Sequence, residues 1–176
     1  MPHIALAQVF TRSAKRAGIE LEMTQGFSPR AKISFGPELP AGVVALNEPV
    51  DMYTQKHYPE IIDMMNAALP EGFTVSRAVY LPEGLPNLGK YCTNAEYLLR
   101  STNGQDIGWS VRTFWYENIL SFEREGGWLR IAVKNPAQNT IGGLVRHLMY
   151  KDIIAGWHEI NIVRVAVGMY SMYQGA

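Results

Sequence analysis

The sequence predicts an α+β fold. Segments with the apolar spacing of a helix are interspersed with short segments in which apolar and polar residues alternate, as they do in strands. The chain has 176 residues, of which 47% are hydrophobic and 18% are charged. A chain of this length and composition can bury a substantial core and is not expected to be disordered. Residues 82–89 include two prolines and two glycines, which indicates a boundary. We therefore predict a first half at residues 1–81, a linker at 82–90 and a second half at 91–176.

The first half is predicted to open with a helix at residues 3–17, whose apolar positions recur every three or four residues. A second helix is predicted at residues 58–69, where Pro59 suits the first turn and apolar residues again follow a helical spacing. The strands predicted for this half lie at residues 20–24, 30–36, 48–54 and 73–81.

The second half is predicted to contain a hairpin at Gly126-Gly127, because adjacent glycines between two strand-like segments favour a two-residue turn. Its predicted elements are strands at residues 95–101, 115–124, 128–134 and 159–169, and a helix at 138–150. Between the first two of these strands only residues 103–110 are available, too few for a full first helix. The second half is therefore expected to be irregular. Each half thus combines a sheet with helices in the manner of a ferredoxin-like α/β sandwich.

A turn between the first two predicted strands is the strongest candidate site. Its candidate binding residues are Gln25, Gly26, Phe27, Ser28, Pro29, Arg30 and Lys32. Glycine permits a sharp turn and proline fixes its exit, after which strict alternation places both cations on the face opposite Ile33 and Phe35. An exposed Phe27 beside the cations would combine stacking with charge, as sites for nucleotides or single-stranded RNA do. The alternative is that Phe27 fills the core and the cations are solvated.

The end of the first predicted helix carries three further cations, Arg12, Lys15 and Arg16. They would extend the site toward phosphates or an acidic partner surface, although a solvated helix face explains them equally well. Charge is segregated along the chain, since residues 1–35 hold five basic and two acidic side chains while residues 36–125 hold six and twelve. We include Arg12 and Arg16 among the candidate binding residues.

No metal site is predicted in this chain. Cys92 is the one cysteine, which excludes an internal disulfide and suits a reducing compartment. The histidines have no second ligand at close spacing; they are His3, His57, His147 and His158. No apolar run approaches the roughly 18 residues of a membrane span, and no secretory leader opens the sequence. A cytoplasmic location without a membrane partner is therefore expected.

Aromatic residues enrich the middle of the chain. They are Tyr91, Trp109, Phe114, Trp115, Tyr116 and Trp128. Core packing at sheet spacing is one explanation for them, and an aromatic binding surface is the other. The segment 169–173 is unusually apolar for a tail, so it is expected either to dock on another chain or to pack on its own domain.

Four motifs in order resemble a known family. They are a basic helix at 12–17, the turn at 24–29, a Lys-Ile-Ser-Phe strand at 32–35 and a Leu-Pro-Ala-Gly exit at 39–42. This order resembles the radical-SAM-linked domain of unknown function, which is found beside or fused to bacterial radical S-adenosylmethionine (SAM) proteins. Weaker similarity continues to about residue 100 and then fades.

The resemblance implies that the first half lacks its opening strand, because the family places a strand before the first helix. A sheet that lacks a strand leaves the backbone groups of the neighbouring strand unpaired, and a strand from elsewhere can pair with them. The expected donors are residues 163–173 of the same chain or a second copy in a homodimer.

The resemblance also implies a function. We expect a non-catalytic module that works with a radical SAM protein and holds or orients a substrate, either RNA or a protein associated with translation. An iron–sulfur cluster and SAM are expected only in the partner, because such a cluster needs three cysteine thiolates and this chain has one cysteine. The alternatives are an RNA- or nucleotide-modifying enzyme and a structural assembly domain.

Overall fold

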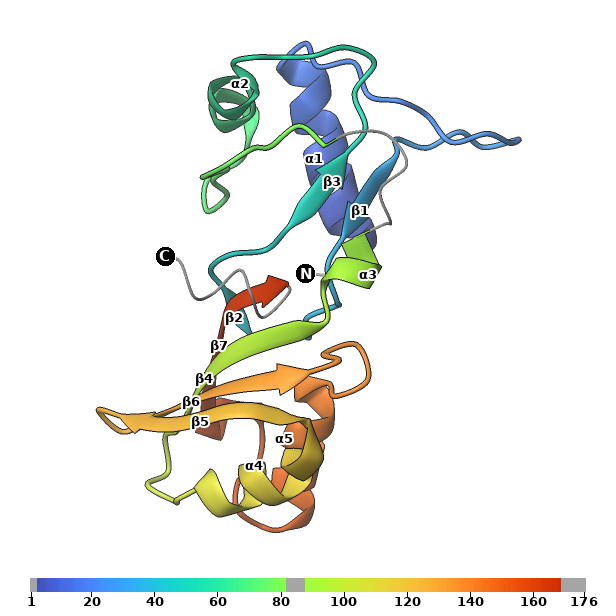
Figure 1. Ribbon diagram of the computed structural model, residues 1–176. Coiled ribbons are helices and arrows are strands. Elements are labelled where there is room, and N and C mark those ends of the chain that lie inside the picture. Colours follow the sequence, from blue (N-terminus) through green and yellow to red (C-terminus); the bar gives the residue numbers. More distant parts are fainter. Residues whose placement is uncertain (1–2, 82–87, 169–176) are drawn as a thin grey trace. The chain divides into compact units, whose positions relative to one another are not determined.

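The computed structural model describes residues 3–81 and 88–168, and it confirms the α+β class (Figure 1). The chain divides into two compact units, of which the first comprises residues 1–35 and 50–87 and the second comprises residues 36–49 and 88–176. The segment 36–49 thus belongs to the second unit, although the sequence analysis placed it in the first half. No helix in the described ranges is both long and apolar enough to cross a bilayer.

The first unit packs two helices and a small sheet around a common core. Its elements are α1 (His3–Arg16), β1 (Ile33–Phe35), β3 (Val50–Met52) and α2 (Ile61–Ala68). Strands β1 and β3 pair antiparallel, with Ile33 opposite Met52 and Phe35 opposite Val50. The fully buried core residues are Ala14, Ile19, Tyr58 and Met65. Partly buried apolar residues from both helices complete this cluster, and Phe10 meets Phe35 edge to face at 5.8 Å.

The predicted strands at 20–24 and 30–36 are only partly formed. Outside β1 they contribute two isolated bridges, Leu21 with Thr54 and Met23 with Ala31. Within the described part of this unit the sheet therefore has two strands, β1 and β3, and not the larger sheet of a ferredoxin-like half.

The predicted strand at 73–81 is wrong, and side-chain hydrogen bonds tie this segment to the rest of the unit instead. The Asn66 amide on α2 accepts a hydrogen bond from Val75 N at 2.7 Å and donates one to Val75 O at 3.0 Å. The Tyr80 hydroxyl accepts from Tyr58 N at 2.5 Å and donates to Tyr58 O at 3.0 Å. This segment is thus held to the core without joining a sheet.

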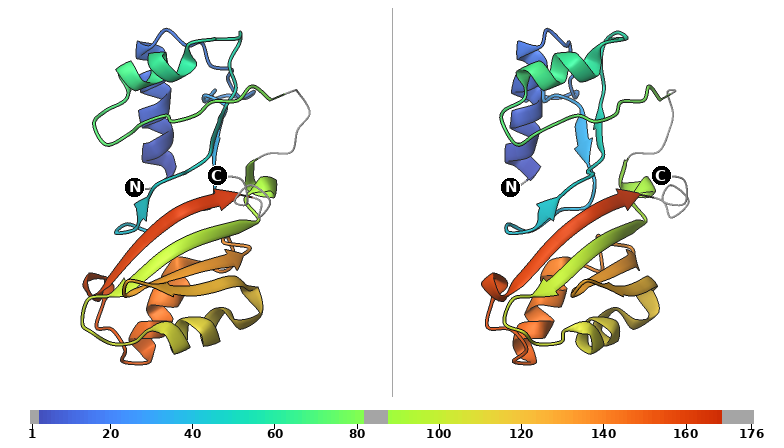
Figure 2. Two further views of the ribbon diagram at one scale, coloured as in Figure 1. Left: turned by 60° about the vertical axis from the view of Figure 1, so that its left-hand side comes forward. Right: turned by 90° about the vertical axis from the view of Figure 1, so that its left-hand side faces the viewer.

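The second unit is a five-stranded sheet with two helices on one face (Figure 2). Its elements are β2 (Val44–Ala45), α3 (Leu88–Tyr91), β4 (Asn94–Ser101), α4 (Gly108–Trp115), β5 (Ile119–Glu125), β6 (Trp128–Lys134), α5 (Ile141–Tyr150) and β7 (Ile160–Gly168). The strand order is β2-β7-β4-β6-β5, in which β2 runs parallel to β7 and the other neighbours are antiparallel. From β4 to β7 the elements follow a βαββαβ order. The core lies between this sheet and helices α4 and α5.

The predicted hairpin between β5 and β6 is confirmed. Glu125 faces Trp128 across the turn, and Gly126 and Gly127 have φ of 54° and 82°. Positive φ at both central residues matches the twist of the flanking strands and favours glycine at both.

The predicted strand at 115–124 begins too early, because Gly108–Trp115 forms α4 and β5 starts at Ile119. Ile107, Val111 and Trp115 are all buried at a spacing of four residues, so this stretch has a helical period that reaches past residue 110. Trp115 belongs to the core, whereas Trp109 and Tyr116 are 74% and 75% exposed. Core packing therefore explains Trp115, while Trp109 and Tyr116 lie on the surface of the second unit.

The expected donor strand at 163–173 has another role within the described residues. Strand β7 lies between β4 and β2 in the sheet of the second unit. Residues 169–173, and residues 82–87 of the predicted linker, lie outside the described ranges, while residues 88–90 belong to α3.

Candidate functional site

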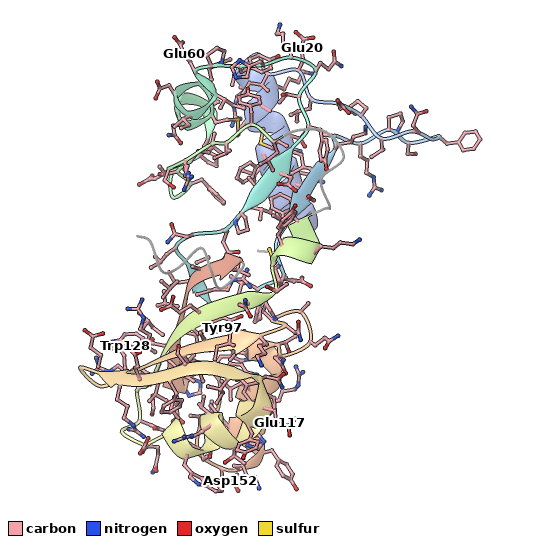
Figure 3. All side chains as sticks on the ribbon, viewed as in Figure 1. Glu20, Glu60, Tyr97, Glu117, Trp128 and Asp152 are labelled. Atoms are coloured by element: carbon pink, nitrogen blue, oxygen red, sulfur yellow. The ribbon has the colours of Figure 1, made fainter. Side chains whose placement is uncertain are left out.

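The candidate site is a narrow projection of the first unit that we call the arm, residues 20–32, between α1 and β1 (Figure 1). The preceding residue, Ile19, is 4% exposed and anchors the arm in the core. The arm runs outward through Met23, turns at 25–28 and returns through Ala31. In Figure 3 the side chains of this projection stand apart from those of the rest of the unit.

Three residues close the base of the arm with a ring of backbone hydrogen bonds. Lys32 N donates to Glu22 O at 2.8 Å, Glu22 N donates to Tyr53 O at 2.8 Å, and Tyr53 N donates to Lys32 O at 3.1 Å. Their side chains add to this ring, since Lys32 Nζ lies 2.7 Å from Glu22 Oε2 and 5.9 Å from the centre of the Tyr53 ring. The three strand-like segments that meet here are thus fixed to one another by main-chain and side-chain contacts.

The outer part of the arm has its own short ladder. Thr24 N donates to Arg30 O at 2.7 Å, and Arg30 N donates to the Thr24 hydroxyl at 3.0 Å. Gly26 has φ of +124°, a value that side chains with a Cβ rarely adopt, so glycine permits the turn. The Phe27 ring at the tip is completely exposed, with a relative exposure of 111%. The explanation that Phe27 fills the core is therefore wrong.

The predicted cations fall into two groups. Lys32 is paired with Glu22, and Arg16 donates to Ala68 O at 2.6 Å and to the Ser13 hydroxyl at 3.1 Å. Ala68 is the last residue of α2, where exposed carbonyls attract positive charge, so Arg16 joins α1 to α2. Arg12 and Arg30 are exposed, and within the described residues their side chains have no hydrogen-bond or ion-pair partner. The structure thus brings Lys32 to the base and Arg30 to the outer arm, and it assigns Arg16 to helix packing.

The remaining tip residues shape and expose the arm. Gln25, Ser28 and Pro29 are all exposed, and no side-chain hydrogen bond of Gln25 or Ser28 occurs within the described part of the chain. Pro29 directly precedes the residue whose backbone pairs with Thr24. The tip therefore presents an aromatic ring between small and polar neighbours.

Metal-binding and nucleophilic side chains do not gather at the arm. In residues 3–81 and 88–168, no three His, Cys, Asp or Glu side chains lie together as metal ligands would. His57 and His147 instead pack on aromatic rings, with ring centres 4.0 Å from Tyr80 and 5.0 Å from Phe114. Cys92 is buried at 3% exposure in the second unit.

A buried charge in the second unit was missed by the sequence analysis. Arg164 on β7 is 2% exposed, and its guanidinium donates to both carboxylate oxygens of Glu48 and to Pro37 O at 2.8 Å. Burial raises the pKa of the neighbouring Tyr97, and the Arg164 cation opposes part of that rise. Alternation along β7 would have revealed this residue, because Ile160, Ile162 and Arg164 occupy the same inward face.

An open groove of about 510 Å³ lies beside the β5–β6 hairpin of the second unit. Arg100 lies 5.9 Å from the centre of the Trp128 ring, and Arg124 forms a bidentate pair with Asp106 at 2.8 and 2.9 Å. Both cations thus contact side chains of their own unit, whereas Arg30 of the arm has no such partner within the described residues.

Comparison with known proteins identifies a family but no characterized relative. A family model described as an uncharacterized protein conserved in bacteria (DUF2344) matches residues 1–131. Neither the curated proteins nor the solved structures give a match. The matched range covers the arm, both helices of the first unit and the second unit as far as β6. The chain therefore belongs to the DUF2344 family of uncharacterized proteins conserved in bacteria.

Proposed function

We propose that the chain is a non-catalytic binding module that works with a radical SAM protein in the cytoplasm and engages a partner or substrate through the arm. The observation that carries the proposal is the complete exposure of Phe27 at the tip of a projection with a fixed base. A phenyl ring left in water forgoes favourable burial energy, and a ring that projects at the tip of a supported arm is in a position to regain that energy on a partner.

The arm contributes little to the core of its own unit. Residues 23–30 are all exposed, and none of them belongs to the buried cluster around Tyr58 and Met65. The base, in contrast, is fixed by three backbone hydrogen bonds and an ion pair. This combination suits a recognition element, because rigid support lowers the entropic cost of presenting an exposed side chain.

The link to a radical SAM protein rests on the resemblance of the four ordered motifs, which include the arm itself. The iron–sulfur cluster and SAM would be held by that partner, and this chain would hold or orient its substrate during an RNA- or translation-related modification. The cluster needs three cysteine thiolates, and this chain supplies one cysteine, which is buried.

The experiment that tests the proposal is co-purification of the full chain with the radical SAM proteins of its native bacterium. Each radical SAM protein is expressed with an affinity tag beside the untagged chain, and complexes are resolved by size-exclusion chromatography. A complex with one of them, retained at micromolar concentration and lost with Phe27→Ala, supports the proposal. Failure of every radical SAM protein to retain the chain overturns it.

A further inference from the structure

The chemistry of the arm narrows the kind of partner that it fits. Phe27 has the highest exposure among the large apolar side chains of the described residues, at 111%, and it lies at the tip of the arm. A fully exposed phenyl ring gains most from a pocket that surrounds it, because burial of an aromatic side chain removes a large apolar area from water. The tip is thus built as an anchor for a concave apolar surface.

The charge of the arm is small and localised. Between Met23 and Ala31, Arg30 is the one charged residue, and its side chain is exposed without a partner within the described chain. Lys32 is neutralised by Glu22, and Arg16 is held by Ala68 O. Nucleic-acid affinity depends on many phosphate contacts, whereas one guanidinium matches one carboxylate in a bidentate pair. These charges favour an acidic protein site over a polyphosphate backbone.

The direction of the arm is set before any partner binds. The hydrogen-bond ring of Glu22, Lys32 and Tyr53 fixes the base, and the Thr24–Arg30 ladder holds the two sides of the outer arm together. Lys32 therefore helps to hold the tip in place.

We infer that the arm inserts Phe27 into an apolar pocket on a partner protein and that Arg30 pairs with a carboxylate at the rim of that pocket. This inference rests on the proposed function, because both take the arm as the contact site. It adds that the partner is a protein and describes the chemistry of its pocket. Binding of RNA by the arm is the outcome that would contradict it.

Site-specific photo-crosslinking distinguishes the two classes. The photoreactive residue p-benzoylphenylalanine replaces Phe27 in the full chain, which is then irradiated in its native bacterium. The matched control carries the same residue at Trp109, an exposed aromatic position of the second unit at 74% exposure. We expect position 27 to give one discrete protein adduct that the control does not give, with a crosslinked segment rich in apolar residues and bearing an Asp or Glu.

Affinities of the purified partner for full-length variants then test the roles of the two residues. We expect Phe27→Ala to weaken binding about 30-fold, as an anchor residue does, and Arg30→Ala to weaken it about 5- to 10-fold. Arg77→Ala, which removes an exposed cation of the first unit outside the arm, should change the affinity less than about twofold.

Each outcome decides a different question. A radical SAM protein in the adduct supports both the inference and the proposed function, while another protein with an acidic apolar site supports the inference and overturns the proposed partner. A nuclease-sensitive adduct, or no adduct above the control, overturns the inference. Equal loss of affinity in Arg30→Ala and Arg77→Ala would overturn the role assigned to Arg30.

Discussion

Arg164 and Glu48 form a bidentate ion pair although 116 positions separate them in the sequence, with Nε–Oε1 and Nη2–Oε2 distances of 2.7 and 2.5 Å. The arginine is buried on strand β7, and the glutamate belongs to the segment that enters the second unit from β1 and returns to β3. The pair thus fastens a remote piece of chain to the sheet. Its partial burial makes it more costly to break than a pair in open solvent.

Loss of this carboxylate should destabilise the second unit. We expect Glu48→Gln to lower the free energy of unfolding by about 2–3 kcal/mol, because a buried guanidinium loses its counter-charge. The measurement is urea unfolding followed by tryptophan fluorescence. Asp106→Asn, which weakens the exposed pair with Arg124, is the control and should cost less than about 1 kcal/mol. Equal losses in the two variants would contradict the role of burial.

The Asn66 amide should stabilise the first unit through both of its hydrogen bonds to Val75. We expect Asn66→Ala to cost about 1–2 kcal/mol because it removes both bonds, and Asn66→Asp to cost at least as much because it places a carboxylate oxygen against Val75 O. Chemical denaturation measures both losses, and amide hydrogen exchange at Val75 reports the local effect. An Asp variant as stable as the unmodified chain would show that the bond to Val75 O contributes nothing.

The ion pair at the base of the arm should limit its opening. We expect Glu22→Gln to accelerate amide exchange at Thr24 and Lys32 by about 2- to 5-fold, in keeping with an exposed pair worth up to about 1 kcal/mol. Native-state hydrogen exchange by NMR gives these rates. The amide of Leu69, which bonds within α2, serves as an internal control and should keep its rate. Unchanged exchange at both arm positions would argue that the backbone ring alone fixes the base.

The Asp106 carboxyl should titrate below its ordinary range. Its pKa is lowered first by the hydrogen bond from Gly108 N and then by Arg124, so Arg124→Gln should raise the pKa without restoring the ordinary value. A pKa that is lower in the folded state stabilises the fold at neutral pH, and this contribution is lost as pH falls through the folded-state pKa. Carbon-13 NMR of labelled aspartate measures both values. An unchanged pKa in the variant would exclude a contribution from Arg124.

Two adjacent glycines of α5 should respond differently to alanine. A Cβ at Gly142 would meet only Arg146 Nη1, at 3.6 Å, whereas a Cβ at Gly143 would lie 3.3 Å from Phe114 Cζ and 3.2 Å from the Thr140 hydroxyl. Alanine favours helix, so we expect Gly142→Ala to stabilise the fold by about 0.5 kcal/mol, while crowding offsets this gain in Gly143→Ala. Thermal unfolding measures the difference. A more stable Gly143 variant would show that Phe114 moves freely.

Local patterns were sufficient for elements whose partners are near in sequence. Adjacent glycines predicted the β5–β6 hairpin, and apolar spacing predicted α1, α2 and α5 to within a few residues. The apolar pattern at 73–81 did not predict the structure of that segment. The Asn66 side chain bonds the backbone of Val75 there, and the Tyr80 side chain bonds the backbone of Tyr58, contacts that no strand pattern reveals. The assignment of Trp115 to a strand was wrong for a different reason. Aromatic residues are common in strands, but a buried tryptophan packs equally well from a helix, as it does here.

The candidate site was predictable in its position but not in its internal contacts. Glycine and proline around Phe27 indicated a turn, and the structure shows that turn with the ring exposed. The sequence could not show that Lys32 is neutralised by Glu22 or that Arg16 reaches Ala68 O, because both contacts depend on how separate segments meet.

Residues 36–49 interrupt the first unit, so the chain passes between the two units three times. A fragment that begins at residue 88 would keep Arg164 but lose Glu48, Pro37 and strand β2, leaving a buried guanidinium without its acceptors and one edge of β7 uncovered. A fragment that ends at residue 87 would carry the apolar segment around Val43 without the sheet that it packs on. Cutting the chain at residue 87 would therefore remove from each piece contacts that the intact chain makes, so we expect the two pieces to fold together rather than apart.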